Sequence, residues 1–198
     1  MTYEPAEDSF FLEKEIIKYL ERLNEKEISK FKVLDMGSGS GIQAKACIDK
    51  GILKKNLFLI DLDSEAIKLL KNQKIFEDKN IILSDLFSEI PKTPEYLFDI
   101  IIFNAPYLPK DDQDYDTGID TTGGKQGYEI TLRFLKQAKD YLKNKGILFL
   151  LISSHTNKSK ITDFLLRNDY KIIEINEESS FFEKLYVLKI SKILTNNI

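Results

Sequence analysis

The sequence predicts an α/β protein with a doubly wound sheet of seven strands, helices on both faces and an antiparallel last strand. Three observations lead to this fold class. Short apolar runs alternate five times with segments of helical periodicity, the pattern of a parallel sheet with crossover helices. A glycine-rich turn joins the first of these runs to the helix after it. Two further apolar runs close the chain with an acidic turn between them.

Length and composition indicate a single domain over residues 1–198, with residues 1–30 as an N-terminal helical segment and residues 191–198 as a tail. Apolar residues make up 42% of the chain and charged residues 31%, an ordinary balance for a globular protein. No signal peptide or membrane-crossing run is evident, and Cys47 is the single cysteine. We therefore expect a cytoplasmic protein without membrane contact. The net charge of −3 gives no global basic field, which argues against direct nucleic-acid binding.

The first helix is expected to begin between Pro5 and Ser9, where acidic groups suit a first turn. Apolar side chains then recur at helical spacing as far as Leu23. This pattern predicts an amphipathic helix that covers one side of the sheet.

A strand, a glycine turn and a helix follow one another. The strand over residues 31–35 ends at Asp35, and the helix over residues 42–50 begins directly after the turn. Glycines allow a positive φ and a close approach of the backbone to a ligand. A dinucleotide-binding pattern would need glycine at position 42, which is Ile42, and would lack the acid before the turn. The glycines of the turn are Gly37, Gly39 and Gly41.

Two acidic side chains follow the next two expected strands, residues 57–60 and 80–83. Asp61 lies 20 residues beyond the last glycine of the turn, where a carboxylate can accept from both hydroxyls of a ribose. Its alternative role is to cap the following helix, for which Asp63 or Ser64 is the expected cap. A carboxylate just past the third strand, as at Asp85, can accept from an adenine amine, and a surface turn is the alternative.

The fourth strand, residues 98–104, is short, β-branched and expected to be buried on both faces. It ends in Asn104, Ala105, Pro106 and Tyr107. Proline cannot donate to a ladder, so the strand stops there and leaves a polar side chain at its carboxyl end. Open α/β sheets bind ligands at that edge. The alternative is an ordinary strand end followed by a proline turn.

The second half of the chain completes the alternation. A polar loop over residues 110–126 carries five aspartates, which would repel phosphate backbones and attract a cationic peptide, or would simply be solvated. His155, the single histidine, lies in a polar loop and is given no role. The remaining elements expected are helices over residues 128–142 and around 161–165, strands over residues 147–152, 171–175 and 185–190, and an acidic turn over residues 177–183.

The order of these motifs resembles the HemK-like glutamine N5-methyltransferases. The resemblance is strongest to the short archaeal and eukaryotic branch, which modifies the Gly-Gly-Gln motif of class 1 translation release factors. Its most specific part is Tyr-Glu-Pro-Ala-Glu-Asp at residues 3–8, and it extends through Asn104–Tyr107 and Gly123–Gly127 to the closing strands. It implies a Rossmann-like, class I methyltransferase sheet and S-adenosylmethionine as the methyl donor.

The resemblance also implies roles for single residues. Asp35 and the glycine turn (Gly37, Gly39, Gly41) would hold the methionine part of the donor, and Asp61 its ribose. Asp85 and the backbone of Leu86 would contact its adenine. Ser9 stands where the family usually has threonine near the donor. Asn104, beside the donor, and the Ala105 carbonyl would bind the glutamine amide, and Pro106 and Tyr107 complete that motif.

Three further expectations follow. Members of this branch commonly need a small zinc-binding activator protein, whereas one cysteine and one histidine give this chain no zinc site of its own. Ala105 replaces the first proline of the family motif, which lowers rigidity but keeps the carbonyl. The alternatives are a methyltransferase acting on the exocyclic amine of a nucleic-acid base, which presents the same planar NH2, or a catalytically impaired donor-binding scaffold.

Overall fold

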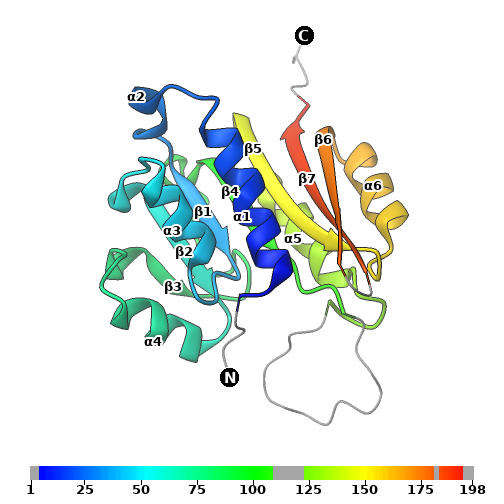
Figure 1. Cartoon of the computed structure of the whole chain (residues 1–198), viewed down its shortest axis with the longest axis horizontal. Helices are drawn as coiled ribbons and strands as arrows, with labels where there is room; N and C mark the ends of the chain where they lie inside the picture. The colour runs from blue at the N-terminus through cyan, green and yellow to red at the C-terminus, as the bar shows by residue number, and fades with distance from the viewer. Residues whose placement is uncertain (1–4, 109–122, 181–182, 194–198) are drawn as a thin grey trace.

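The computed structural model describes residues 5–108, 123–180 and 183–193, which form a seven-stranded sheet with helices on both faces (Figure 1). The strand order is β3-β2-β1-β4-β5-β7-β6. β7 is antiparallel to β5 and β6, and the other neighbouring strands are parallel. The predicted fold class is therefore confirmed, including the antiparallel last strand.

The strands are β1 (Val33–Met36), β2 (Leu57–Asp61), β3 (Ile81–Leu83), β4 (Phe98–Asn104), β5 (Leu142–Ser153), β6 (Tyr170–Ser179) and β7 (Lys184–Lys192). The α-helices are α1 (Glu7–Leu20), α2 (Glu25–Ile28), α3 (Ile42–Asp49), α4 (Ser64–Asn72), α5 (Glu129–Tyr141) and α6 (Lys158–Arg167). Short 3-10 turns are η1 (Lys54–Asn56), η2 (Asp78–Asn80) and η3 (Pro94–Tyr96). None of the helices described is both long enough and apolar enough to cross a bilayer.

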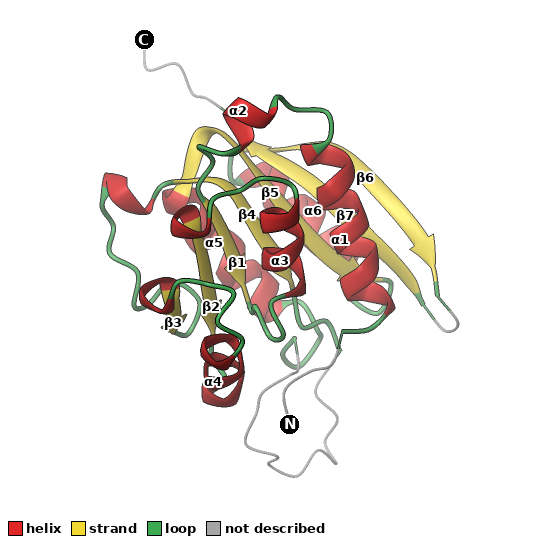
Figure 2. Ribbon diagram, turned by 60° about the vertical axis from the view of Figure 1, so that its left-hand side comes forward, coloured by secondary structure: helices red, strands yellow, loops and turns green. Residues whose placement is uncertain are grey.

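Helices cover the sheet in two layers, with α1 and α3 on one face and α5 and α6 on the other (Figure 2). β4 lies in the middle and contributes to both cores. Ile100 and Ile102 pack on the side of α1 and α3, whereas Ile101 and Phe103 pack on the side of α5 and α6. Alternate side chains of an extended strand point to opposite faces, so an uninterrupted apolar run suits a strand that is buried on both. The predicted burial of β4 is confirmed.

Two predicted boundaries are wrong. β5 begins at Leu142, where it already pairs with Phe98, and not at residue 147. β6 continues through residues 177–179, which were predicted to form an acidic turn, and Ser179 pairs with Lys184. β6 is an edge strand, and Glu177 on it is exposed and forms an ion pair with Lys184 across the hairpin at 3.4 Å. Acidic residues are tolerated there because an edge strand keeps its side chains partly in water.

Parallel strands bring the predicted site residues to one edge of the sheet. Met36 pairs with Ile60 on one side and with Phe103 on the other. The carboxyl ends of β1, β2 and β4 therefore lie level, and the residues that follow them are neighbours. This edge is where open α/β sheets bind their ligands.

Candidate active site

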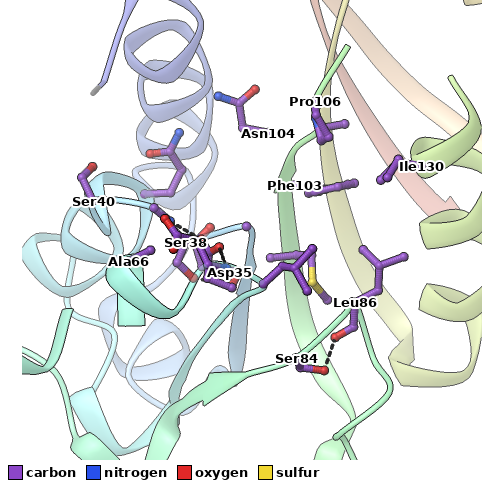
Figure 3. Close-up of a pocket in the computed structure, with 18 of the residues that line it drawn as sticks. Asp35, Ser38, Ser40, Ala66, Ser84, Leu86, Phe103, Asn104, Pro106 and Ile130 are labelled. Atoms are coloured by element: carbon purple, nitrogen blue, oxygen red, sulfur yellow. Dashed lines mark hydrogen bonds between the residues drawn. The ribbon is translucent and has the colours of Figure 1, made fainter. Parts of the chain in front are cut away.

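A cavity of about 720 Å³ lies at the carboxyl edge of the sheet, within the usual size range of small-molecule sites. In Figure 3, Asn104 and Pro106 lie at one end of it and Ser84 and Leu86 at the other, with Asp35 between them. Every predicted site residue except Gly41 lines this cavity. The structure therefore brings the donor residues and the substrate residues of the sequence analysis into one site.

The glycine turn contains two kinds of glycine. Gly39 lines the cavity with a φ of 49°, and a Cβ atom built on it would meet nothing within 4 Å. Gly41 precedes α3 with a φ of 80°, and a Cβ atom there would lie 2.8 Å from Leu70 Cδ2 and 2.9 Å from Phe76 Cε2. Gly41 is therefore required by packing against α4 and its loop, and its predicted contact with a cofactor stays a prediction.

Asp35 is a buried acid on the cavity wall. Its side chain is 3% exposed, and its Oδ2 atom has no hydrogen-bond partner among the described residues. Burial raises the pKa of this carboxyl from 3.8 to about 8, with a backbone N–H of Ala44 opposing the rise and the charge of Asp61 adding to it. An acceptor buried without a donor costs roughly 1–3 kcal/mol. The site is therefore suited to a ligand that brings a positively charged N–H group.

Asp61 supports the glycine turn and reaches the cavity. Its Oδ2 accepts from the N–H of Gly39 and its Oδ1 from the N–H of Asp63, both at 2.8 Å. Burial raises its pKa, although these N–H groups act in the opposite direction. The cap of α4 is Asp63, which accepts from the N–H of Glu65 at 2.8 Å, as predicted. Each carboxylate oxygen has two lone pairs, so Asp61 can still accept from ligand hydroxyls.

The far end of the cavity is formed by the turn after β3. Leu86 is buried with a φ of 51°, an unusual conformation for a residue with a side chain. Its carbonyl accepts from Ser84 Oγ at 2.9 Å, which holds the turn (Figure 3). Asp85 is exposed and forms an ion pair with Arg133 of α5 at 2.5 Å. Strained backbone of this kind gathers at functional sites.

Asn104 lies at the end of β4 and is oriented by the first turn of α1. Its Nδ2 donates to Asp8 Oδ2 at 3.0 Å and to Ser9 Oγ at 3.4 Å. Its Oδ1 is buried without a hydrogen-bond partner in the described part of the chain. Asn104 therefore has a buried acceptor without a partner, on the wall of the cavity at the end away from Leu86 (Figure 3).

Tyr107 is held by the β6–β7 hairpin. Its hydroxyl donates to Glu183 Oε1 at 3.2 Å, and Ser153 Oγ donates to the other oxygen of the same carboxylate. Ala105, between Asn104 and the prolines, is 1% exposed and packs in the core on the side of α5. The segment after β4 is thus fixed both by packing and by hydrogen bonds.

The chain returns to the same place at Gly123. Its N–H donates to the carbonyl of Leu108 at 2.9 Å. A Cβ atom on Gly123 would lie 2.4 Å from the carbonyl oxygen of Gly127 and 2.6 Å from that of Pro106. Most of the acidic loop predicted over residues 110–126, including all five aspartates, lies outside the described residues.

The cavity is also lined by residues that the sequence did not indicate, among them Asp8, Gln43 and Arg133. Asp8 belongs to the motif at residues 3–8, which was the one available signal, but its contact with Asn104 joins residues 96 positions apart. Among the described residues, no group of three His, Cys, Asp or Glu side chains is placed to hold a metal ion.

Comparisons with known proteins bear on this geometry. The family model "Methyltransferase small domain" matches residues 18–183. The chain belongs to this methyltransferase family. A relative from Methanocaldococcus jannaschii is "Putative protein N5-glutamine methyltransferase MJ0928", which is 34% identical to the present chain. The match covers 94% of the present chain and 89% of the relative.

Two further relatives extend the match. The "eRF1 methyltransferase catalytic subunit mtq2" of Schizosaccharomyces pombe is 27% identical over 96% of the methyltransferase and 89% of the relative. A solved structure of the E. cuniculi Mtq2–Trm112 complex, described as methylating the eRF1 translation termination factor, superimposes with a TM-score of 0.69 at 23% identity. The superposition covers 96% of the present chain and 98% of the Mtq2 chain, which supports the class I methyltransferase fold.

Proposed function

We propose that this methyltransferase transfers a methyl group from S-adenosylmethionine to the side-chain amide nitrogen of a glutamine in a class 1 translation release factor. The observation that carries the proposal is Asn104, whose Oδ1 is a buried acceptor without a partner in the described part of the chain. It lies in the same cavity as the buried acid Asp35. One acceptor suits an N–H of the substrate and the other suits the cationic group of the donor.

The described residues fit the proposed donor. Asp35 Oδ2 offers a buried acceptor for the ammonium group of the methionine part. Asp61 would accept from the ribose hydroxyls, and Asp85 with the backbone of Leu86 would contact the adenine. Asp35 and Leu86 lie apart along one cavity (Figure 3). When bound, S-adenosylmethionine supplies a sulfonium methyl group that is open to attack by a nitrogen lone pair.

The role of the chain is then to make an amide nitrogen reactive. That nitrogen is a poor nucleophile because its lone pair is shared with the neighbouring carbonyl. Asn104 Oδ1 and the Ala105 carbonyl would each accept one N–H, hold the nitrogen facing the methyl group and stabilise the positive charge that develops on it. A nitrogen–carbon bond forms as the carbon–sulfur bond breaks, and one N–H proton then leaves to water. Tyr107 would pack against the flat amide.

The substrate and partner follow from the relatives. The S. pombe relative is named as an eRF1 methyltransferase subunit, and the E. cuniculi protein is solved as a complex with Trm112. We extend both properties to this chain, with a class 1 release factor as substrate and a small zinc-binding protein as activator. The proposed substrate is a translation factor, which agrees with a cytoplasmic protein.

One labelling experiment tests the proposal. The methyltransferase, alone and with its activator, is incubated with S-adenosylmethionine labelled in the methyl group and with a class 1 release factor, a DNA duplex or transfer RNA in parallel. We expect label in the release factor and none after the glutamine of its Gly-Gly-Gln motif is changed to alanine. Label in a nucleic acid would favour the base-amine alternative, and label in none of them despite donor binding would favour the impaired scaffold.

A further inference from the structure

The first turn of α1 holds two amide side chains of the cavity wall. Asn104 Nδ2 donates to Asp8 and Ser9 Oγ, and Gln43 Nε2 donates to the carbonyl of Ser9 at 3.2 Å. In both side chains the amide oxygen is buried and has no hydrogen-bond partner within the described residues. This turn therefore determines which end of each amide remains for a ligand.

Asp8 fixes the orientation of Asn104 by its chemistry. An ionised carboxylate accepts hydrogen bonds and cannot donate them, so only the NH2 end of the Asn104 amide can face it. The distance of 3.0 Å between Nδ2 and Asp8 Oδ2 is typical of a charge-assisted hydrogen bond. Rotation of the amide by 180° would bring two oxygens together and would expose an NH2 group where the substrate also presents one.

Asp8 is itself held in place. It is 6% exposed, and its Oδ1 accepts from the N–H of Ser9 at 2.6 Å and from Ser9 Oγ at 3.3 Å. The N–H is one of the helix's first-turn donors, which have no partner within the helix. Glu7 is the other acid of this turn, but it is exposed and accepts from Ser180. The two acids share the helix dipole, so Glu7 is a matched control for Asp8.

We propose that Asp8 is a positioning residue for methyl transfer, which orients Asn104 so that its Oδ1 accepts an N–H of the substrate amide. The inference rests on the proposed function, because it gives Asn104 a planar NH2 group to bind. Asp8 acts through Asn104 and not through the donor. Its loss should therefore slow turnover while leaving donor affinity nearly unchanged.

A double-mutant cycle tests this role. Methyl transfer to a release factor is measured under single-turnover conditions for Asp8→Ala, Asn104→Ala and the double variant, with Glu7→Gln as the control. We expect Asp8→Ala to lower the rate about 10- to 100-fold, the size of one charge-assisted hydrogen bond. In the Asn104→Ala background the same change should add nothing. Asp8→Asn, which can offer its amide oxygen to Asn104, should recover part of the rate.

Several outcomes would overturn the inference. They are an Asp8→Ala rate within twofold of the wild type, additive losses in the double variant, or a loss that appears as weaker binding of S-adenosylhomocysteine in calorimetry. If Asp8→Ala fails to fold, the methyl-transfer rates of Asp8→Asn and Glu7→Gln are compared instead. Asp8→Asn should be slower than Glu7→Gln, and equal rates would overturn the inference. Failure of the proposed function is distinguishable, because the wild type itself would then transfer no methyl group to the release factor.

Gln43 carries a second inference on separate contacts. Its side chain is 4% exposed, its NH2 group is bound to Ser9, and its Oε1 is left as a buried acceptor. The next residue, Ala44, gives its N–H to the Asp35 carboxyl. We infer that Gln43 Oε1 is a second acceptor, beside Asp35, for the ammonium group of the methionine part of the donor.

A pair of ligands tests Gln43 without any activity measurement. S-adenosylhomocysteine has the ammonium group, and 5′-methylthioadenosine has the same adenosine but lacks it. Calorimetry with Gln43→Leu should show about tenfold weaker binding of the first ligand and unchanged binding of the second, as for one lost hydrogen bond to a charged group. Gln43→Met serves the same purpose if the leucine variant is unstable. Equal weakening of both ligands, or of neither, would contradict the assignment.

Discussion

Replacing Asp35 with asparagine should remove the pH dependence of donor binding. Burial keeps Asp35 protonated up to a pKa of about 8 in the ligand-free protein. A cationic ligand favours the ionised form, so binding below pH 8 must release the proton. Affinity should therefore rise about tenfold between pH 6 and pH 7 and level off above pH 8. The side-chain amide of the variant has no proton to release at any of these pH values.

The Asp35 carboxyl also makes the stability of the ligand-free protein depend on pH. Donor affinity should rise with pH, whereas this contribution to stability should fall. The pKa of Asp35 is raised in the fold above its ordinary value of 3.8, so its contribution to stability is fully present below pH 3.8. That contribution is lost progressively as the pH rises through about 8. Asp35→Asn keeps a neutral side chain, so its stability relative to the wild type should increase from pH 5 to pH 8.

Calorimetry with S-adenosylhomocysteine measures the proton directly. Titrations at pH 7 in buffers with different ionisation enthalpies should give a release of close to one proton per ligand for the wild type and less for Asp35→Asn. Thermal unfolding across pH 5 to pH 8 measures the stability change in the absence of ligand. An affinity that stays flat between pH 6 and pH 8, with no proton released, would refute the reasoning about Asp35.

Three further predictions concern the cavity and the glycines packed beside it. Asp61→Asn should weaken donor binding by roughly 1.5–3 kcal/mol for each charge-assisted bond lost, and unchanged affinity in calorimetry would contradict its role at the ribose. Gly41→Ala should lower the free energy of unfolding by about 1–3 kcal/mol because its Cβ would lie 2.8 Å from Leu70 Cδ2. Gly39→Ala meets open space, although a φ of 49° strains any side chain there, so it should weaken donor binding more than Gly41→Ala does. The reverse order of the two variants in binding curves would contradict these roles. Gly123→Ala should slow methyl transfer without changing donor affinity, because its Cβ would lie 2.6 Å from the Pro106 carbonyl and displace the substrate segment. Normal turnover of that variant would show that the segment is not sensitive to this contact.

The sequence predicted the parts of the fold that depend on local patterns. The apolar run of β4 identified a strand buried on both faces, and the glycine turn after β1 was placed correctly because positive φ angles favour glycine. The acids and the amide at strand ends were found because parallel strands bring their carboxyl ends to one edge. These inferences need only the order of residues along the chain.

The features of the fold and the site that the sequence did not indicate depend mainly on contacts between distant segments. Asp8 meets Asn104 across 96 residues, and Arg133 meets Asp85 across 48, so neither pair has a local signature. The length of β6 was underestimated because exposed glutamates on an edge strand have the composition of a turn. Leu86 adopts its positive φ without being glycine, which no pattern in the sequence indicates.

The proposed function depends on Asn104 binding a planar NH2 group beside the methyl donor. The most direct measurement is mass spectrometry of a release factor methylated in a single turnover by the wild type and by Asn104→Ala. We expect the methyl group on a glutamine amide nitrogen and a rate at least about 100-fold lower for the variant, whose donor affinity is retained. A methyl group on another side chain, or equal rates for the two proteins, would contradict it.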